Sequence, residues 1–204
     1  MSSKEKILQV ALDQFYHNGY QASSVDDIIE LAGVSKSNFY YHFRTKEDLV
    51  LTVLNFRSEQ LQQGLRCTLL NADKNPVERL HSFMQMMKTS QEESIRQCGC
   101  PFGNLVAEMA EHSEKIRCTL SRMFGDLTHY VADVISEGQS LGMFRSDVSA
   151  TDMAALIVNS LQGMLLMTKC HKSVESLAKG VTTLINLIET DDVRNENARQ
   201  QFLV

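Results

Sequence analysis

Helix-breaking residues are scarce in this sequence: its 204 residues include two prolines and ten glycines, and it contains no tryptophan. Because β-branched alternation is also scarce, the composition favours an all-α chain. The sequence has no apolar run of about 18 residues, the minimum for a membrane span. Its first residues, MSSKEK, are not a signal peptide. We therefore expect a cytoplasmic protein without a membrane partner.

Sequence patterns of catalysis and metal binding are also missing. The sequence has no GxSxG, HExxH or P-loop pattern, so we do not expect an enzyme. Its five cysteines are an odd number, which argues against a disulfide framework in a reducing compartment. Cys98 and Cys100 lack zinc-ribbon spacing and a second ligand pair, so we expect no metal and no cofactor.

Acidic residues are absent from one stretch, although the chain as a whole has a formal net charge of −5. Between Leu31 and Lys46 there is no Asp or Glu, while Lys36 and Arg44 add positive charge. Such a local excess of positive charge is compatible with a nucleic-acid partner even in an acidic protein.

The same part of the chain has the pattern of two short helices joined by a tight turn. Ser24 is a good N-cap, and Asp27 can complete a capping box. Gly33 supplies the left-handed residue that ends the first helix, and Ser35 caps the second, from Lys36 to about His42. Phe39 and Phe43 are four residues apart and are expected to point inward. The pattern predicts a helix-turn-helix.

The second of these helices keeps a polar and aromatic outer face. The residues expected on it are Lys36, Ser37, Asn38, Tyr40, Tyr41 and His42. A helix presented in this way fits the major groove of B-DNA, about 12 Å wide. Lys46 lies at the N-terminus of the next helix, where backbone N–H groups favour a phosphate. An ordinary solvated surface is the alternative, but two adjacent exposed tyrosines argue against it.

Apolar spacing predicts further helices along the whole chain. Their expected ranges are residues 3–19, 46–71, 76–97, 101–111, 113–139, about 150 through Leu165, and 173–188, with a polar, loosely ordered tail from Asp191. Ser149 with Asp152 predicts another capping box. We thus expect about nine helices: a three-helix DNA-binding head over residues 1–47 and a larger helical domain over residues 48–204.

Residues 4 to about 56 resemble the DNA-binding domain of TetR-family transcriptional regulators. The resemblance rests on Phe15…Gly19-Tyr20, on the AGVS turn, on FYYHF from Phe39 and on KEDL from Lys46. It implies that Lys36, Ser37 and Tyr40 approach bases, whereas Ser24, Ser35, Tyr41, His42 and Lys46 hold phosphates. Ser37 departs from the glycine that the family often carries, so the operator preference does not transfer.

The family resemblance also implies what the second domain does. In the family the last two long helices, here residues 150–189, pair with their copies in a homodimer, although intramolecular core is the alternative. A small apolar effector is expected among Phe83, Met84, Met87, Phe102, Leu105, Val106, Met109, Met123, Phe124 and Met164. Polar candidates near the pocket wall are Asn104, Glu108, His112, His129 and Gln162.

The segment from Cys98 to Glu108 resembles a subgroup of the family with a cysteine at this break, some of whose members sense electrophiles or oxidants. Cys100 precedes the helix start at Pro101, where the helix dipole favours a reactive thiolate; a small buried residue is the alternative.

The sequence therefore predicts a ligand-responsive regulator, usually a repressor, that binds a pseudo-palindromic duplex operator as a homodimer. Thiol sensing through Cys100, with Cys98 as a second thiol, is one alternative. Others are an architectural DNA-binding protein without effector, and an enzyme or carrier that has kept the DNA-binding head only as a relic.

Overall fold

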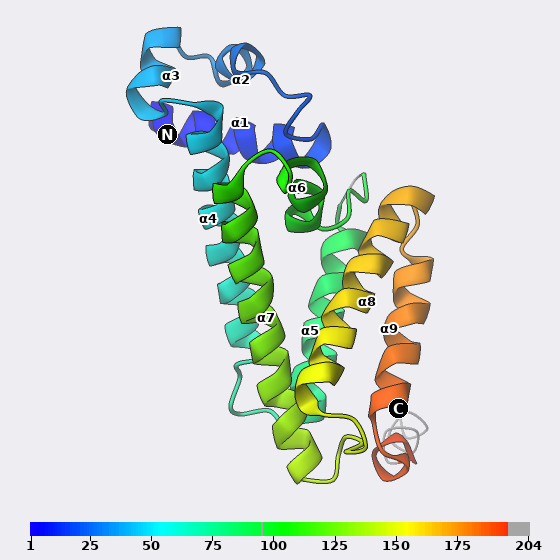
Figure 1. Cartoon of the computed structure of the whole chain (residues 1–204). Coiled ribbons are helices and arrows are strands. Elements are labelled where there is room, and N and C mark those ends of the chain that lie inside the picture. The colour runs from blue at the N-terminus through cyan, green and yellow to red at the C-terminus, as the bar shows by residue number, and fades with distance from the viewer. Residues whose placement is uncertain (95, 196–204) are drawn as a thin grey trace. The chain divides into compact units, whose positions relative to one another are not determined.

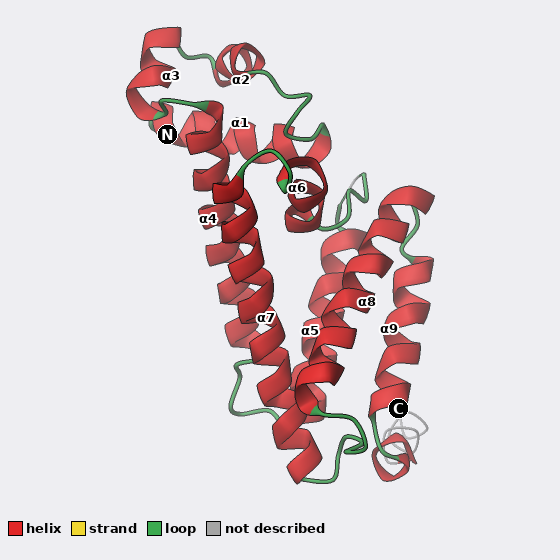
Figure 2. Cartoon of the chain, viewed as in Figure 1, coloured by secondary structure: helices red, strands yellow, loops and turns green. Residues whose placement is uncertain are grey.

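The computed structural model describes residues 1–94 and 96–195, and within these ranges the chain is built of helices without a strand (Figure 2). The all-α prediction is confirmed. The labelled helices (Figure 1) are α1 (Ser3–His17), α2 (Val25–Ala32), α3 (Lys36–His42), α4 (Lys46–Cys67), α5 (Pro76–Glu92), α6 (Pro101–Met109), α7 (Glu114–Ser140), α8 (Ala150–His171) and α9 (Glu175–Ile188). Residues 191–195 form a further helical turn, and the rest of the predicted polar tail lies outside the described residues.

The chain forms two compact units. Unit 1 consists of residues 1–61 and 100–121, and unit 2 of residues 62–99 and 122–204. This division differs from the predicted boundary between residues 47 and 48. In unit 1, α6 bonds to the turn after α1 and Ser113, just before α7, bonds to α4; no local pattern reveals these long-range contacts.

In unit 1, helices α1, α2 and α3 pack against one another as a three-helix head (Figure 1). The predicted capping box of Ser24 with Asp27 is present, and Ser2 with Glu5 forms another at the start of α1. Gly33 ends α2 with a φ of 62°, in the left-handed region. The buried apolar side chains of these helices are Ile7, Ala11, Leu12, Phe15, Ile28, Ala32 and Phe39.

Helix α6 joins the head through the turn that follows α1. The Glu108 carboxylate accepts a hydrogen bond from the backbone N–H of Gln21, with 2.9 Å between N and Oε2. In addition, the Ser113 hydroxyl donates to the Glu47 carboxylate at 3.0 Å. Gly19 has a φ of 89°, and a β-carbon added there would lie 2.8 Å from Glu108 Oε1. Glu108, predicted as a wall residue of the effector pocket, thus holds the α1–α2 turn.

Two helices end earlier than predicted. Helix α4 ends at Cys67 rather than near residue 71, and the backbone N–H groups of Thr68 and Leu70 both donate to the carbonyl of Leu65 in a turn that closes the helix. Helix α5 ends at Glu92 rather than at residue 97; Ile95, expected within it, lies outside the described residues. The buried Gln91 holds the segment that follows, since its side-chain amide donates to the carbonyl of Gly99 at 3.2 Å and accepts from the Gly99 N–H at 3.1 Å.

Unit 2 is organised around α8 and α9, which lie side by side, with α5 packed on α9. Ion pairs tie its elements together: Arg79 to Glu137 at 2.6 Å, and His81 to the buried carboxylate of Glu189 at 2.6 Å. The core of the two last helices consists of Met153, Ala154, Ile157, Val158, Leu161, Leu165, Leu177, Val181, Leu184, Ile185 and Ile188.

The start of α8 is capped only in part as predicted. Ser149 accepts from the N–H of Asp152 at 3.1 Å, but the Asp152 carboxylate accepts from the Ser149 hydroxyl instead of from the Ser149 backbone N–H.

Helix α8 is 22 residues long with a mean hydropathy of 1.3 in its most apolar window, which satisfies the length and composition of a membrane span. Such a window is also common in core helices, and seven α8 residues are buried.

Candidate nucleic-acid interface

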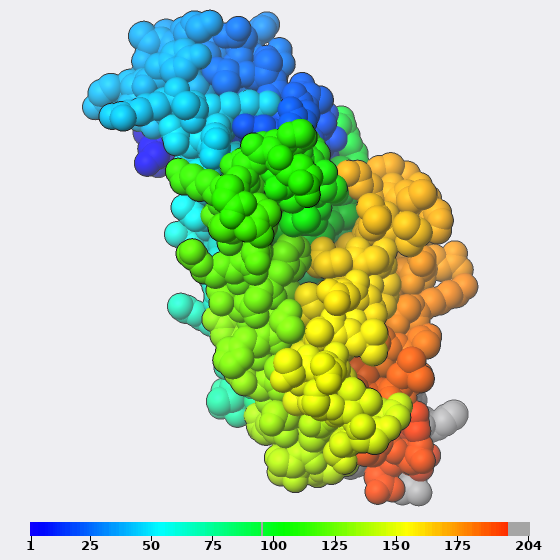
Figure 3. All heavy atoms as spheres, in the orientation of Figure 1, coloured from blue at the N-terminus to red at the C-terminus, as the bar shows by residue number. Residues whose placement is uncertain are grey.

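Helix α3 is fixed to the head by its aromatic inner side. Phe39 is fully buried and Phe43 nearly so, and their ring centroids lie 5.9 Å apart. Ser35 caps the helix by accepting a hydrogen bond from Asn38 N–H at 3.2 Å. These short-range contacts determine which side of α3 faces outward. In Figure 3 the light-blue atoms of this part of the head form an open surface.

Most residues predicted to contact DNA lie on that outer side. Tyr41 is 83% exposed and Tyr40 is 47% exposed, unusually high values for aromatic side chains. The other exposed members of the predicted set are Ser24, Ser35, Lys36 and Ser37, and the half-buried ones are Asn38, His42 and Lys46. The head therefore presents hydroxyl, aromatic and ammonium groups together, as a major-groove reader requires.

The Lys36 ammonium already has a partner within the head. Its Nζ lies 3.0 Å from Oδ1 of Asp26, which is in the first turn of α2. This hydrogen bond and the charge of Asp26 raise the pKa of Lys36 above its ordinary value. Next to the pair, the hydroxyls of Ser35 and Ser37 lie 3.0 Å apart. Asp26 was not identified from the sequence, because only the fold brings it next to α3.

Two predicted contacts have a different local environment from the rest. The side-chain carbonyl oxygen of Asn38 is buried without a hydrogen-bond partner, so that atom does not face outward. The Lys46 ammonium donates to the backbone carbonyl of Tyr20 and lies 4.1 Å from the centre of the Tyr20 ring. Burial lowers the pKa of Lys46, while Glu108 acts in the opposite direction. In this structure Lys46 holds the end of the α1–α2 turn.

The residues predicted to bind an effector are divided between the units. Phe102, Leu105 and Met109 are buried residues of unit 1, together with the exposed Val106. Unit 2 contains the buried Phe83 and Met84 and the half-buried Met87, Met123, Phe124 and Met164. Of the polar candidates, His112 and His129 are exposed and Asn104 and Gln162 are half-buried. The effector pocket formed by these residues stays a prediction.

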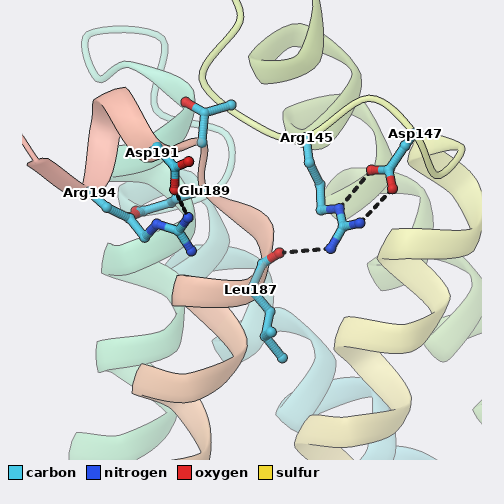
Figure 4. Close-up of a pocket in the computed structure, with 7 residues that line it drawn as sticks. Arg145, Asp147, Leu187, Glu189, Asp191 and Arg194 are labelled. Carbon is cyan, nitrogen blue, oxygen red and sulfur yellow. Dashed lines mark hydrogen bonds and ion pairs between the residues drawn. The ribbon is translucent and has the colours of Figure 1, made fainter.

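A hollow of about 440 Å³ in unit 2 lies elsewhere, between the segment after α7 and the end of α9 (Figure 4). Its charged side chains pair with each other: Arg145 Nε donates to Asp147 at 2.6 Å, and Arg194 pairs with Asp191. The hydrogen bond from Arg145 lowers the pKa of Asp147. Because these guanidinium groups are already paired, the hollow offers no ready anion site.

The two cysteines of the break differ in their surroundings. Cys98 is buried, whereas Cys100 is half-buried and caps α6, its sulfur accepting from Gly103 N–H at 3.4 Å. Within the described residues, no group of three or more His, Cys, Asp or Glu side chains is arranged to hold a metal ion.

Comparisons with known proteins identify the family of both parts of the chain. Residues 7–53 match the family model of bacterial regulatory proteins, tetR family, and residues 76–184 match the tetracyclin repressor-like C-terminal domain. The chain is 29% identical over 196 residues to the HTH-type transcriptional repressor DhaR of Mycobacterium sp. strain GP1, covering 95% of this chain and 97% of that protein. Over 63 residues, 31% of this chain and 34% of the relative, it is 46% identical to the HTH-type transcriptional regulator QacR of Staphylococcus aureus.

Solved structures share the whole fold. The crystal structure of regulatory protein TetR from Rhodobacter sphaeroides superposes with a TM-score of 0.85 at 23% identity, covering 92% of this chain and all of that one. The two family models together span the helix-turn-helix and most of the helical region that follows. The chain belongs to the tetR family of bacterial regulatory proteins.

Proposed function

We propose that this protein is a ligand-responsive transcriptional repressor of the cytoplasm that binds a pseudo-palindromic operator as a homodimer. The observation that carries the proposal is the outer side of α3, where Lys36, Tyr40 and Tyr41 are exposed while Phe39 and Phe43 anchor the helix from within. Lys36, Ser37 and Tyr40 would approach bases, and the remaining predicted residues would position the head on phosphates.

A homodimer is supported by apolar side chains on the surface of the last two helices. Leu156 and Leu166 of α8 are 59% and 57% exposed, and Leu187 of α9 is 59% exposed. Asn159 and Gly163 lie between the two leucines at helical spacing, so one side of α8 is largely apolar or small. Two heads on half-sites about 34–36 Å apart require such a twofold partner. Leu156→Asp with Leu166→Asp should give a monomer by light scattering and abolish cooperative operator binding.

Operator binding is tested by substitution of Tyr40. An operator would first be found by selection from randomised duplexes, and affinities would then be measured by fluorescence anisotropy at fixed salt. Tyr40→Ala should weaken binding by about 1–3 kcal/mol, and Tyr40→Phe would separate the contribution of the hydroxyl from that of the ring. Gln85→Ala, at an exposed residue of unit 2, should leave the affinity unchanged. Equal affinity of Tyr40→Ala and the unsubstituted protein would refute this placement and revive the relic-head alternative.

The role of Lys46 can be distinguished by the salt dependence of binding. A lysine that neutralises a phosphate contributes about one unit to the slope of log affinity against log salt concentration. If Lys46 leaves Tyr20 for a phosphate, Lys46→Met should reduce the slope by about two units per dimer. If it only holds the α1–α2 turn, the affinity should fall while the slope stays the same.

The proposed effector is small and largely apolar, because methionines and aromatic residues dominate the predicted pocket. An effector that releases the operator must bind the non-binding conformation more tightly, and the operator must weaken effector binding by the same factor. A coupling of about 1–3 kcal/mol is the usual scale. Titration of effector with and without operator measures it, and zero coupling would favour the architectural alternative.

A second candidate function is thiol sensing, favoured by the position of Cys100 as the N-cap of α6. The N–H of Gly103 points at its sulfur, and a helix N-terminus stabilises a thiolate. Such a thiolate would attack one oxygen of hydrogen peroxide, so that the O–O bond breaks, hydroxide leaves and the sulfur becomes a sulfenic acid. Peroxide should then release the operator, Cys100→Ser should abolish the release, and Cys67→Ser, at an exposed cysteine outside the break, is the matched control.

A further inference from the structure

The DNA-facing side of the head contains one acid–base pair, formed by Asp26 of α2 and Lys36 of α3. Their charged atoms lie 3.0 Å apart, and the side chains are 76% and 64% exposed, respectively. The stretch from Leu31 to Lys46, which contains α3, has no acidic residue of its own, so the carboxylate next to Lys36 comes from α2.

Attraction to DNA does not account for this carboxylate, and its contribution to stability, through the dipole of α2 and the pair with Lys36, is small. Exposed ion pairs contribute little to folding because solvent screens them and long side chains lose freedom. Near a duplex, a carboxylate repels phosphates and weakens sequence-independent binding. An acid on this surface therefore makes most sense if it contacts a hydrogen-bond donor on a base, and in the major groove the cytosine N4 amino group is such a donor.

We propose that Asp26 and Lys36 together read one G·C pair, with Lys36 donating to guanine O6 and N7 and Asp26 accepting from cytosine N4. This inference rests on the proposed function. In a G·C pair, O6 and N4 are joined by a hydrogen bond of about 2.9 Å, close to the 3.0 Å between Lys36 Nζ and Asp26 Oδ1. The protein donor thus faces the base acceptor while the protein acceptor faces the base donor.

The same pair disfavours the other base pairs. At an A·T pair in the same orientation, Lys36 would meet the adenine N6 amino group and Asp26 would meet thymine O4, so both contacts place like groups together. At an inverted C·G pair the donor and acceptor are exchanged, with the same result. Asp26 therefore contributes specificity mainly by making wrong sequences unfavourable.

The inference is tested on the full-length protein with duplexes selected from a library randomised over one half-site. At the position where G·C is enriched, cytosine is replaced by 2-pyrimidinone, which lacks the N4 amino group. The unsubstituted protein should lose about tenfold more affinity on this replacement than Asp26→Ala does. Glu30→Ala removes an exposed carboxylate from the same helix and should respond like the unsubstituted protein. Asp26→Asn can donate as well as accept, so it should keep G·C and lose only the part of the discrimination against A·T that comes from thymine O4.

The outcomes separate the inference from the proposed function. If no duplex is enriched for the unsubstituted protein, the proposed function fails. If a duplex is enriched but loss of the N4 amino group affects Asp26→Ala as much as the unsubstituted protein, the reading of cytosine by Asp26 is wrong. A uniform gain in affinity of Asp26→Ala for all four base pairs would also overturn it, because the carboxylate would then act only by repelling phosphates.

Discussion

Replacing Gly19 with alanine should disturb the DNA-binding head in two ways at once. The φ of 89° at Gly19 is a conformation that L-residues rarely adopt, and the added β-carbon would lie 2.8 Å from Glu108 Oε1. That carboxylate accepts the Gln21 N–H at 2.9 Å, so it would have to move away from its donor. The substitution therefore strains the backbone and breaks the contact between α6 and the α1–α2 turn.

Both effects can be given a rough size. The backbone strain costs about 1–3 kcal/mol. A hydrogen bond to a charged group contributes about 1.5–3 kcal/mol, which we reduce to about 1 kcal/mol because Glu108 is half-exposed. Gly19→Ala should thus lower the free energy of unfolding by about 2–4 kcal/mol. In a Glu108→Ala background only the strain remains, so the same substitution should cost about 1 kcal/mol less.

The assay is urea unfolding of the four proteins of this double-mutant cycle, at one protomer concentration because dimerisation would add to the apparent stability. Glu108→Gln is a matched variant that keeps the size of the side chain and an acceptor oxygen, so it should lose less than Glu108→Ala. If the costs of Gly19→Ala and Glu108→Ala add within about 0.5 kcal/mol, the methyl group of Gly19→Ala does not disturb the Glu108 carboxylate. The account of α6 as a support of the head would then be wrong.

Three other substitutions test separate parts of the structure. Gly138→Ala would place its β-carbon 2.1 Å from the ring of the buried Phe144; overpacking should outweigh the helix gain and cost about 1–2 kcal/mol in urea unfolding. The hydrogen bond from Arg117 lowers the pKa of Glu114 to about 2. The pair therefore stabilises the fold fully at pH values above the ordinary pKa of a glutamate, and this stabilisation is lost as the pH falls toward 2. Glu114→Gln should lower Tm at pH 7, and the difference in Tm from the unsubstituted protein should shrink toward pH 2. Asn38→Ala removes a buried oxygen without a partner and should raise the free energy of unfolding by about 1 kcal/mol.

The helix-turn-helix could be predicted because its determinants are local. The Ser24–Asp27 capping box and the left-handed Gly33 each act within one helical turn, and both occur as expected. The inward position of Phe39 follows from the helical period alone. For the same reason the exposure of Tyr40 and Tyr41 could be anticipated: with one side of a short helix buried, the other side must face outward.

The remaining features of the head depend on contacts between distant residues. The N-terminal position of Lys46 in α4 suggested a phosphate, but its ammonium bonds to the carbonyl of Tyr20, 26 residues earlier. Glu108 was expected in a ligand pocket and instead bonds to Gln21, 87 residues away. A sequence pattern assigns a role to a charged residue from its position in its own helix. It does not show which distant backbone group the fold brings next to that residue.

These long-range contacts change how an effector could act on the DNA face. Short-range caps determine the shape of α2 and α3, whereas Glu108 and Ser113 stabilise the turn before α2 and the start of α4. Helix α6 begins directly after the Gly99 segment, which Gln91 holds by two hydrogen bonds. If the non-binding conformation lacks the Glu108 bond, that bond alone supplies about 1 kcal/mol, or a fivefold change in operator affinity. Loss of the Ser113 bond as well would bring the coupling to about the middle of the usual 1–3 kcal/mol, without any movement within α3.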